Sequence, residues 1–117
     1  MNLKENADIN RIVISVRASM MEYMEPGESE YTKKDIDTCM NLIDDFLVAM
    51  SAADSRKTAM PHVKKVVLAL NDLNEACEYE LIETDQREQL ADIIILAGYL
   101  KGYNKRTEDT TEDWREW

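Results

Sequence analysis

Residues 61–77 read PHVKKVVLALNDLNEAC and place apolar side chains at the three- and four-residue steps of one helix face. We expect this helix to carry Pro61 in its first turn, where a missing N–H costs nothing, and to end near Tyr79. Its predicted buried face consists of Val63, Val66, Val67, Leu70, Leu73 and Cys77. The same spacing elsewhere in the chain then predicts the fold.

The residues that follow predict a turn and another helix. Leu81 and Ile82 are expected to pack in the connection, and Thr84 or Asp85 to cap the next helix. The apolar positions of that helix are Leu90, Ile93, Ile94, Ala97 and Leu100.

Upstream, the first helix is expected from about Asp8 to Glu25, where Pro26 and Gly27 stop it. Its apolar positions are Ile9, Ile12, Val13, Val16, Met20, Tyr23 and Met24.

A polar loop, Glu28–Tyr31, leads to the second predicted helix. Thr32 and Asp35 have the spacing of a capping box at its start, and Ser51–Ala59 is the predicted connection after it. Its apolar face consists of Ile36, Cys39, Met40, Ile43, Phe46, Leu47 and Met50.

Four amphipathic helices with short links predict an all-α four-helix bundle, antiparallel between neighbours. The chain has only three Gly and two Pro in 117 residues, which disfavours a strand-and-turn architecture. We predict a single domain, with the bundle over residues 1–103 and an acidic, tryptophan-containing tail over residues 104–117.

The net charge of the chain indicates which class of partner it can bind. The net charge is −10 and the pI is about 4.5, which disfavours nucleic acid and anionic membranes. The N-terminal residues are too polar for a signal peptide, and the longest apolar run, IIILAG, is too short to span a bilayer. We therefore expect a cytoplasmic protein whose natural complement is a basic protein.

The acidity is concentrated in two patches. Asp72–Asp92 holds eight acids and one base, a charge of −7, and the last ten residues, EDTTEDWREW, carry a further −4. The other residues sum to about +1. A localised field of this kind selects a partner, whereas evenly spread charge mainly confers solubility.

Reactive side chains give little indication of catalysis. Cys39 and Cys77 fall on apolar helix faces and form no metal-ligand pattern, so we expect buried free thiols in a reducing cytosol. His62, the only histidine, lacks the nucleophile and orienting acid of a hydrolytic triad. The three glycines do not have phosphate-loop spacing. We predict no catalytic residue, no metal and no cofactor.

One enzymatic alternative concerns carboxylates. Glu75-x-x-Glu78 is followed on the next helix by Glu88 and Asp92, which resembles the all-α nucleotide pyrophosphatases, whose ExxE pair precedes an ExxD pair on a later helix. The resemblance implies Mg²⁺ held between helices. The sequence departs from the family pattern because its second pair is spaced ExxxD, because the first pair lacks a flanking acid, and because no basic cluster is placed to hold triphosphate.

The acids near the end of the third helix are the stronger functional signal. The helix dipole disfavours negative charge there by a few tenths to about 1 kcal/mol per residue, whereas it favours acids in the first turn of the fourth helix. Asp72 and Glu75 also point away from the predicted core face. Trp114 and Trp117 are either interface anchors or a cover for the bundle. The predicted partner-binding residues are Asp72, Glu75, Glu78, Tyr79, Glu80, Glu83, Asp85, Trp114 and Trp117.

Two further resemblances bear on function. Leu70–Ile94, with its LNxLNExC and LIETDQRE segments, resembles part of short uncharacterised bacterial helical proteins, which implies a bacterial source and a helical hairpin but no activity. The size, acidity and helicity are similar to those of immunity proteins, the small inhibitors that bacteria make against their own nuclease toxins.

The leading hypothesis is therefore a non-enzymatic protein that neutralises a basic toxin through the acidic hairpin. The alternatives are the Mg²⁺-dependent pyrophosphatase and a homo-oligomeric bundle in which Ile14, Met21 and Leu96 pack against a second copy.

Overall fold

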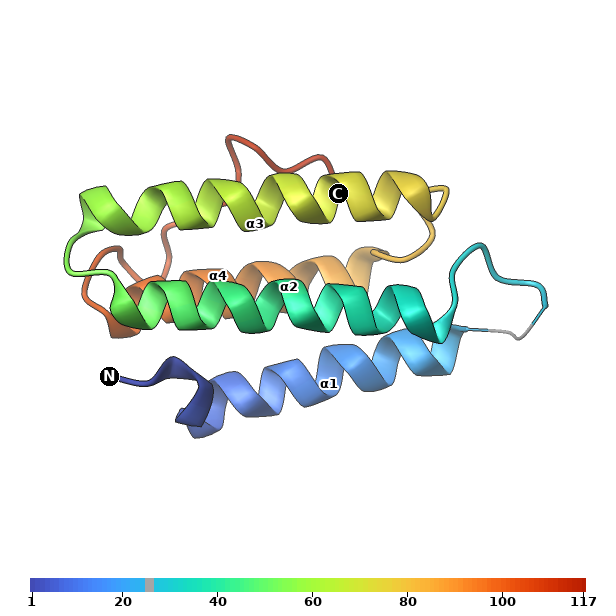
Figure 1. Ribbon diagram of the computed structural model, residues 1–117, viewed down its shortest axis with the longest axis horizontal. Helices are drawn as coiled ribbons and strands as arrows, with labels where there is room; N and C mark the ends of the chain where they lie inside the picture. The colour runs from blue at the N-terminus through green and yellow to red at the C-terminus, as the bar shows by residue number, and fades with distance from the viewer. Residues whose placement is uncertain (25–26) are drawn as a thin grey trace.

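The computed structural model describes residues 1–24 and 27–117, and in these residues it contains four α-helices and no strand. The helices lie side by side in a body of 44 × 27 × 22 Å (Figure 1). A short 3-10 turn, Leu3–Glu5, precedes them, and the helices are α1 (Ala7–Tyr23), α2 (Lys33–Ala52), α3 (Arg56–Ala76) and α4 (Thr84–Leu100). The predicted all-α four-helix bundle is confirmed.

Successive helices run in opposite directions, so the α1–α2 and α3–α4 links lie at the same end of the bundle (Figure 1). The most extensive helix packing joins α1 to α4 and α2 to α3. The core between them is formed by one buried face of each helix, and its largest fully buried side chains are Leu3, Ile9, Met20, Ile36, Ile43, Leu47, Met50, Leu70, Leu81, Leu90, Ile93 and Ile94.

Side-chain caps account for the starts of the first two helices. The Asn6 side chain accepts hydrogen bonds from the amides of Asp8 and Ile9. Thr32 and Asp35 form the predicted capping box, in which the Asp35 carboxylate accepts the Thr32 N–H at 2.9 Å. The predicted end of the first helix falls on Glu25 and Pro26, which lie outside the described residues.

The predicted connection over Ser51–Ala59 is too long. Helix α2 continues to Ala52, and α3 begins at Arg56 because Ser55 and Thr58 form a capping box there, with the Ser55 hydroxyl accepting the Thr58 N–H at 3.2 Å. Pro61 therefore lies one turn further into the helix than predicted, inside α3.

The junction of α3 and α4 also differs from the prediction. Helix α3 ends at Ala76, before the predicted end near Tyr79, because the backbone turns left-handed after Cys77. Glu83 caps α4, in place of Thr84 or Asp85, because the buried Gln86 side chain accepts the Glu83 N–H at 3.1 Å. Leu81 and Ile82 are buried in the connection, as predicted.

Two apolar residues differ from the prediction in their burial. Tyr23, expected on the buried face of α1, is 55% exposed because it is the last residue of the helix. Leu96, expected to be free for contact with a second copy, is buried in the chain's own core. Ile14 and Met21, by contrast, are exposed.

Candidate interaction surface at the acidic end of the bundle

The α1–α2 and α3–α4 links bring negative charge together from distant parts of the sequence. The described residues Gly27–Thr32 and Cys77–Glu83 contain five acids and no base. The two links touch, because the Glu30 N–H donates to the Glu80 carboxylate at 3.1 Å. We call this surface, formed by Tyr23, Gly27–Thr32 and Glu78–Asp85, the acidic end.

The acidic end is hollowed by an open depression of about 500 Å³. Its lining residues are Tyr23, Glu28, Ser29, Tyr31, Glu80, Glu83, Thr84 and Asp85. Carboxylates and two phenol side chains thus share one concave surface. This combination suits a cation that carries an apolar stem, such as a lysine or arginine side chain.

The two tyrosines are held in place by hydrogen bonds. Tyr23 donates to the Asp85 carboxylate at 3.2 Å, and Tyr31 donates to the Met20 carbonyl at 2.9 Å. The hydrogen bond to Asp85 raises the pKa of Tyr23, whereas burial is the main cause that raises the pKa of Tyr31. Both phenols therefore stay neutral and add no negative charge of their own.

Three of the predicted acids at this end also have structural roles. Glu80 accepts the Glu30 N–H, Asp85 accepts the Tyr23 hydroxyl, and the Glu83 side chain accepts a backbone N–H in the first turn of α4. These bonds orient the carboxylates while the residues stay exposed. The surface is therefore charged and ordered at the same time.

A strained turn lies beside the depression. Glu78 and Tyr79 have φ angles of 55° and 62°, the left-handed region that non-glycine residues rarely adopt. The turn is fixed by Tyr79 N–H donating to the Asn74 carbonyl at 2.8 Å, and by Ile82 N–H donating to the buried Asn74 side chain at 2.9 Å. In this turn Tyr79 is 59% exposed next to the acidic links.

The remaining predicted residues lie elsewhere. Asp72 and Glu75 are exposed on α3, as the helix pattern predicted, but they do not line the depression. Trp114 and Trp117 are half-buried and pack against the chain's own core. Their use as anchors for a partner stays a prediction.

The tail is docked along α3. The buried Asn71 side chain donates to the Trp114 carbonyl at 2.8 Å and accepts the Glu116 N–H at 3.0 Å. Arg56 of α3 pairs with Glu108 at 2.8 Å, and the Thr111 side chain is fully buried. Figure 1 shows residues 104–117 returning from the end of α4 to lie over α3.

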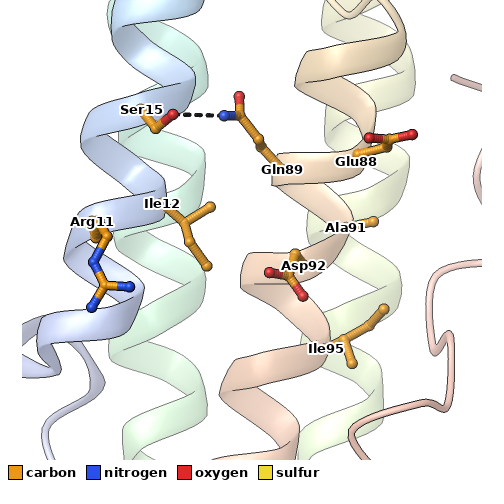
Figure 2. Close-up of a pocket in the computed structure, with 8 residues that line it drawn as sticks. All are labelled: Arg11, Ile12, Ser15, Glu88, Gln89, Ala91, Asp92 and Ile95. Atoms are coloured by element: carbon orange, nitrogen blue, oxygen red, sulfur yellow. Dashed lines mark hydrogen bonds between the residues drawn. The ribbon is translucent and has the colours of Figure 1, made fainter.

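The carboxylates of the pyrophosphatase alternative are dispersed. Glu75 and Glu78 are exposed at the end of α3, whereas Glu88 and Asp92 line a groove between α1 and α4 (Figure 2). Asp92 is also paired with Arg106. Within residues 1–24 and 27–117, no group of three or more Asp, Glu, His or Cys side chains is placed to hold a metal ion.

The groove between α1 and α4 has a volume of about 510 Å³ and is shallow. Gln89 of α4 reaches across it and donates to the Ser15 hydroxyl of α1 at 2.7 Å (Figure 2). Its apolar lining is supplied by Ile12, Ala91 and Ile95.

Both thiols are free and buried, as predicted. Burial raises the pKa of Cys39 to about 12, and burial followed by the nearby Asp35 carboxylate raises that of Cys77 to about 11. Neither is therefore a thiolate near neutral pH. His62 lines a small cavity of about 90 Å³ between α2 and α3, and none of the lining residues is a Ser, Thr or Cys nucleophile.

Sequence reasoning missed the residues that the end of α1 and the first link contribute. Tyr23, Glu28 and Tyr31 complete the depression, yet they lie about 50 residues from the acidic hairpin in the chain. The available signal was topological, since links one and three of an antiparallel four-helix bundle share one end.

None of the described helices combines the length and apolar character needed to cross a bilayer. Comparison with known proteins found no matching family model, no matching curated protein and no matching solved structure.

Proposed function

We propose that this chain is a non-enzymatic binding protein whose acidic end receives a basic protein partner. The observation that carries the proposal is the meeting of two acidic links, five acids without a base, around a depression lined by Tyr23 and Tyr31. Ordinary helix-start chemistry accounts for Asp85, but it does not account for acids on both links of one end.

The proposed mechanism has two steps. The acidic end first attracts the partner, since a one-signed patch raises association rates by roughly 10- to 1000-fold. A lysine or arginine then enters the depression, where its charge meets Glu80 and Glu83 and its stem packs on a tyrosine ring. Tyr79, exposed beside the depression, supplies apolar surface that is removed from water on binding.

The concrete form that we propose is an immunity protein acting in the cytoplasm against a basic, nuclease-type toxin. A nuclease presents a cationic cleft shaped for phosphates, and carboxylates on a fixed surface imitate that charge. The small size, acidity and helicity of the chain support this form.

The test uses charge reversal at acids that have no structural role. The variant E28K/E30K/E78K changes the acidic end but leaves the bonded carboxylates of Glu80 and Asp85 in place. The partner is first captured from native lysate of the source cells, and its association rate is then measured against salt. We expect the association rate to fall by at least about tenfold at low salt, with a shallower salt dependence.

A tail variant, E112K/D113K/E116K, is the matched control because it makes the same change in net charge at exposed residues elsewhere. We expect it to change the rate by no more than about twofold. Equal losses in both variants would show that net charge alone matters, and an unchanged rate in E28K/E30K/E78K would refute the proposed surface.

A further inference from the structure

A second surface has the opposite character to the acidic end. Helix α1 carries exposed apolar side chains on its outer face, with Ile14 69% exposed and Met21 38% exposed. Ala18, one turn from each, is exposed as well. Solitary exposed apolar residues are normal, but these three form a continuous stripe along one helix.

The stripe follows the spacing of a helix–helix seam. Arg11, Ile14, Ala18 and Met21 are separated by three, four and three residues, the steps of alternating a and d positions in a coiled coil. The inner face of α1 is buried in the chain's own core at Ile9, Val16 and Met20. Helix α1 is therefore apolar on two sides, and only one of them is covered within the chain.

Charge indicates what covers the other side. Residues 7–24 contain two acids and two bases, so this segment is neutral in a chain of net charge −10. A basic partner gains nothing from a neutral face, whereas a second copy of this acidic chain meets the least repulsion there. The ends of the stripe also complement each other, with Arg11 at one end and Glu22 at the other.

We infer that α1 forms an antiparallel, two-fold contact with α1 of a second copy. With the axis near Val16, Ile14 of each copy packs on Ala18 of the other, a large side chain on a small one. Arg11 then lies over Met21 of the other copy and reaches its Glu22. In the free chain Arg11 pairs with Asp8 in an exposed ion pair, which is weak enough to exchange for this contact.

The size of the surface sets the expected strength. Helix α1 is about 25 Å long, and together with the groove toward α4 it offers a strip about 20 Å wide. That is roughly 500 Å² per copy, below the roughly 800 Å² of a standard stable interface. We therefore expect a reversible dimer with a dissociation constant in the micromolar range.

Sedimentation velocity on the full chain tests the dimer. From about 1 to about 500 µM, a range that brackets a micromolar constant, we expect the mass to rise from 13.5 kDa toward twice that value. Ile14→Glu should abolish the rise. The matched control is Val48→Glu, which changes an apolar site on α2 that is 56% exposed, and it should leave the rise in mass unchanged. Helix content by circular dichroism should be the same in all three proteins.

A charge swap tests the antiparallel register. Arg11→Glu places a glutamate against Glu22 of the second copy, so we expect at least about tenfold weaker dimerisation, and the double variant R11E/E22R should restore it. The inference would be overturned by a chain that stays monomeric at every concentration. It would also be overturned by a loss of dimerisation in Val48→Glu as large as that in Ile14→Glu, or by a double variant that dimerises as weakly as R11E. None of these measurements involves the proposed basic partner.

Discussion

The tail of the protein offers a sharp test because its docking depends on one buried side chain. Asn71 of α3 makes two hydrogen bonds, one to the Trp114 carbonyl and one from the Glu116 N–H. It is 7% exposed, so water does not readily replace it. Asn71→Ala removes both bonds and alters no hydrogen bond between helices.

The expected magnitude follows from these two bonds. Each contributes about 1 kcal/mol net, so the docked tail loses about 2 kcal/mol, or about 30-fold in its docking equilibrium. Thr110 Oγ1, Arg115 Nε and Trp117 Nε1 of the docked tail are buried and make no hydrogen bond within the chain, so hydrogen bonds from these atoms do not add to the docking free energy.

Tryptophan fluorescence reads the outcome directly, since the only two tryptophans of the chain are Trp114 and Trp117. We expect Asn71→Ala to shift the emission to longer wavelength and to increase quenching by acrylamide, while helix content stays constant. Asn41→Ala, an exposed asparagine on α2, is the control and should change neither. The reasoning fails if Asn71→Ala emits like the wild type, or if its helices are lost together with the fluorescence change.

Three further predictions concern stability, each measured by urea unfolding. Glu78→Gly should raise the free energy of unfolding by about 1 kcal/mol because glycine adopts its φ of 55° without strain, whereas Glu75→Gly inside α3 should lower it by about as much. Gly98→Ala should lower stability because the added methyl group would overlap the Asn104 side chain, which donates to the Ile95 carbonyl at 3.2 Å. In an Asn104→Ala background the same change should raise stability by about 1 kcal/mol, and a loss there would contradict the steric explanation. Because burial raises the pKa of Cys39 to about 12, the unfolded thiol releases its proton first as pH rises above 9.0, so stability should fall between about pH 9 and 12. The free energy of unfolding of Cys39→Ala should fall less steeply over this pH range. Equal slopes in the variant and the wild type would show that Cys39 does not cause the effect.

The fold was predictable because the apolar spacing of each helix is strong enough to identify its buried face. The helix boundaries were less predictable, since they depend on individual side-chain bonds. Ser55 and Thr58 begin α3 earlier than Pro61 suggests, and Gln86 moves the cap of α4 back to Glu83. These bonds form between particular rotamers, and residue spacing alone does not reveal them.

The candidate surface was predictable only in part. Glu80, Glu83 and Asp85 were identified from local charge and do line the depression. Glu28 and Tyr31 were missed because their contribution depends on the two links meeting in space. Asp72 and Glu75 carry the same local signal as the hairpin acids, yet a helix places them away from the depression.

The pairing of helices has a consequence for how the chain folds. Helices α2 and α3 pack together across a link of only three residues, Ala53–Ser55, so their contacts close a short loop at small entropic cost. Helices α1 and α4 also pack extensively, yet most of the chain separates them. We therefore expect the α2–α3 hairpin to form first and to serve as the template on which α1 and α4 assemble together. Glycine inserted after Asp54 should then slow refolding in stopped-flow experiments more than glycine inserted after Gly27, and the reverse order would place the nucleus at the α1–α4 pair.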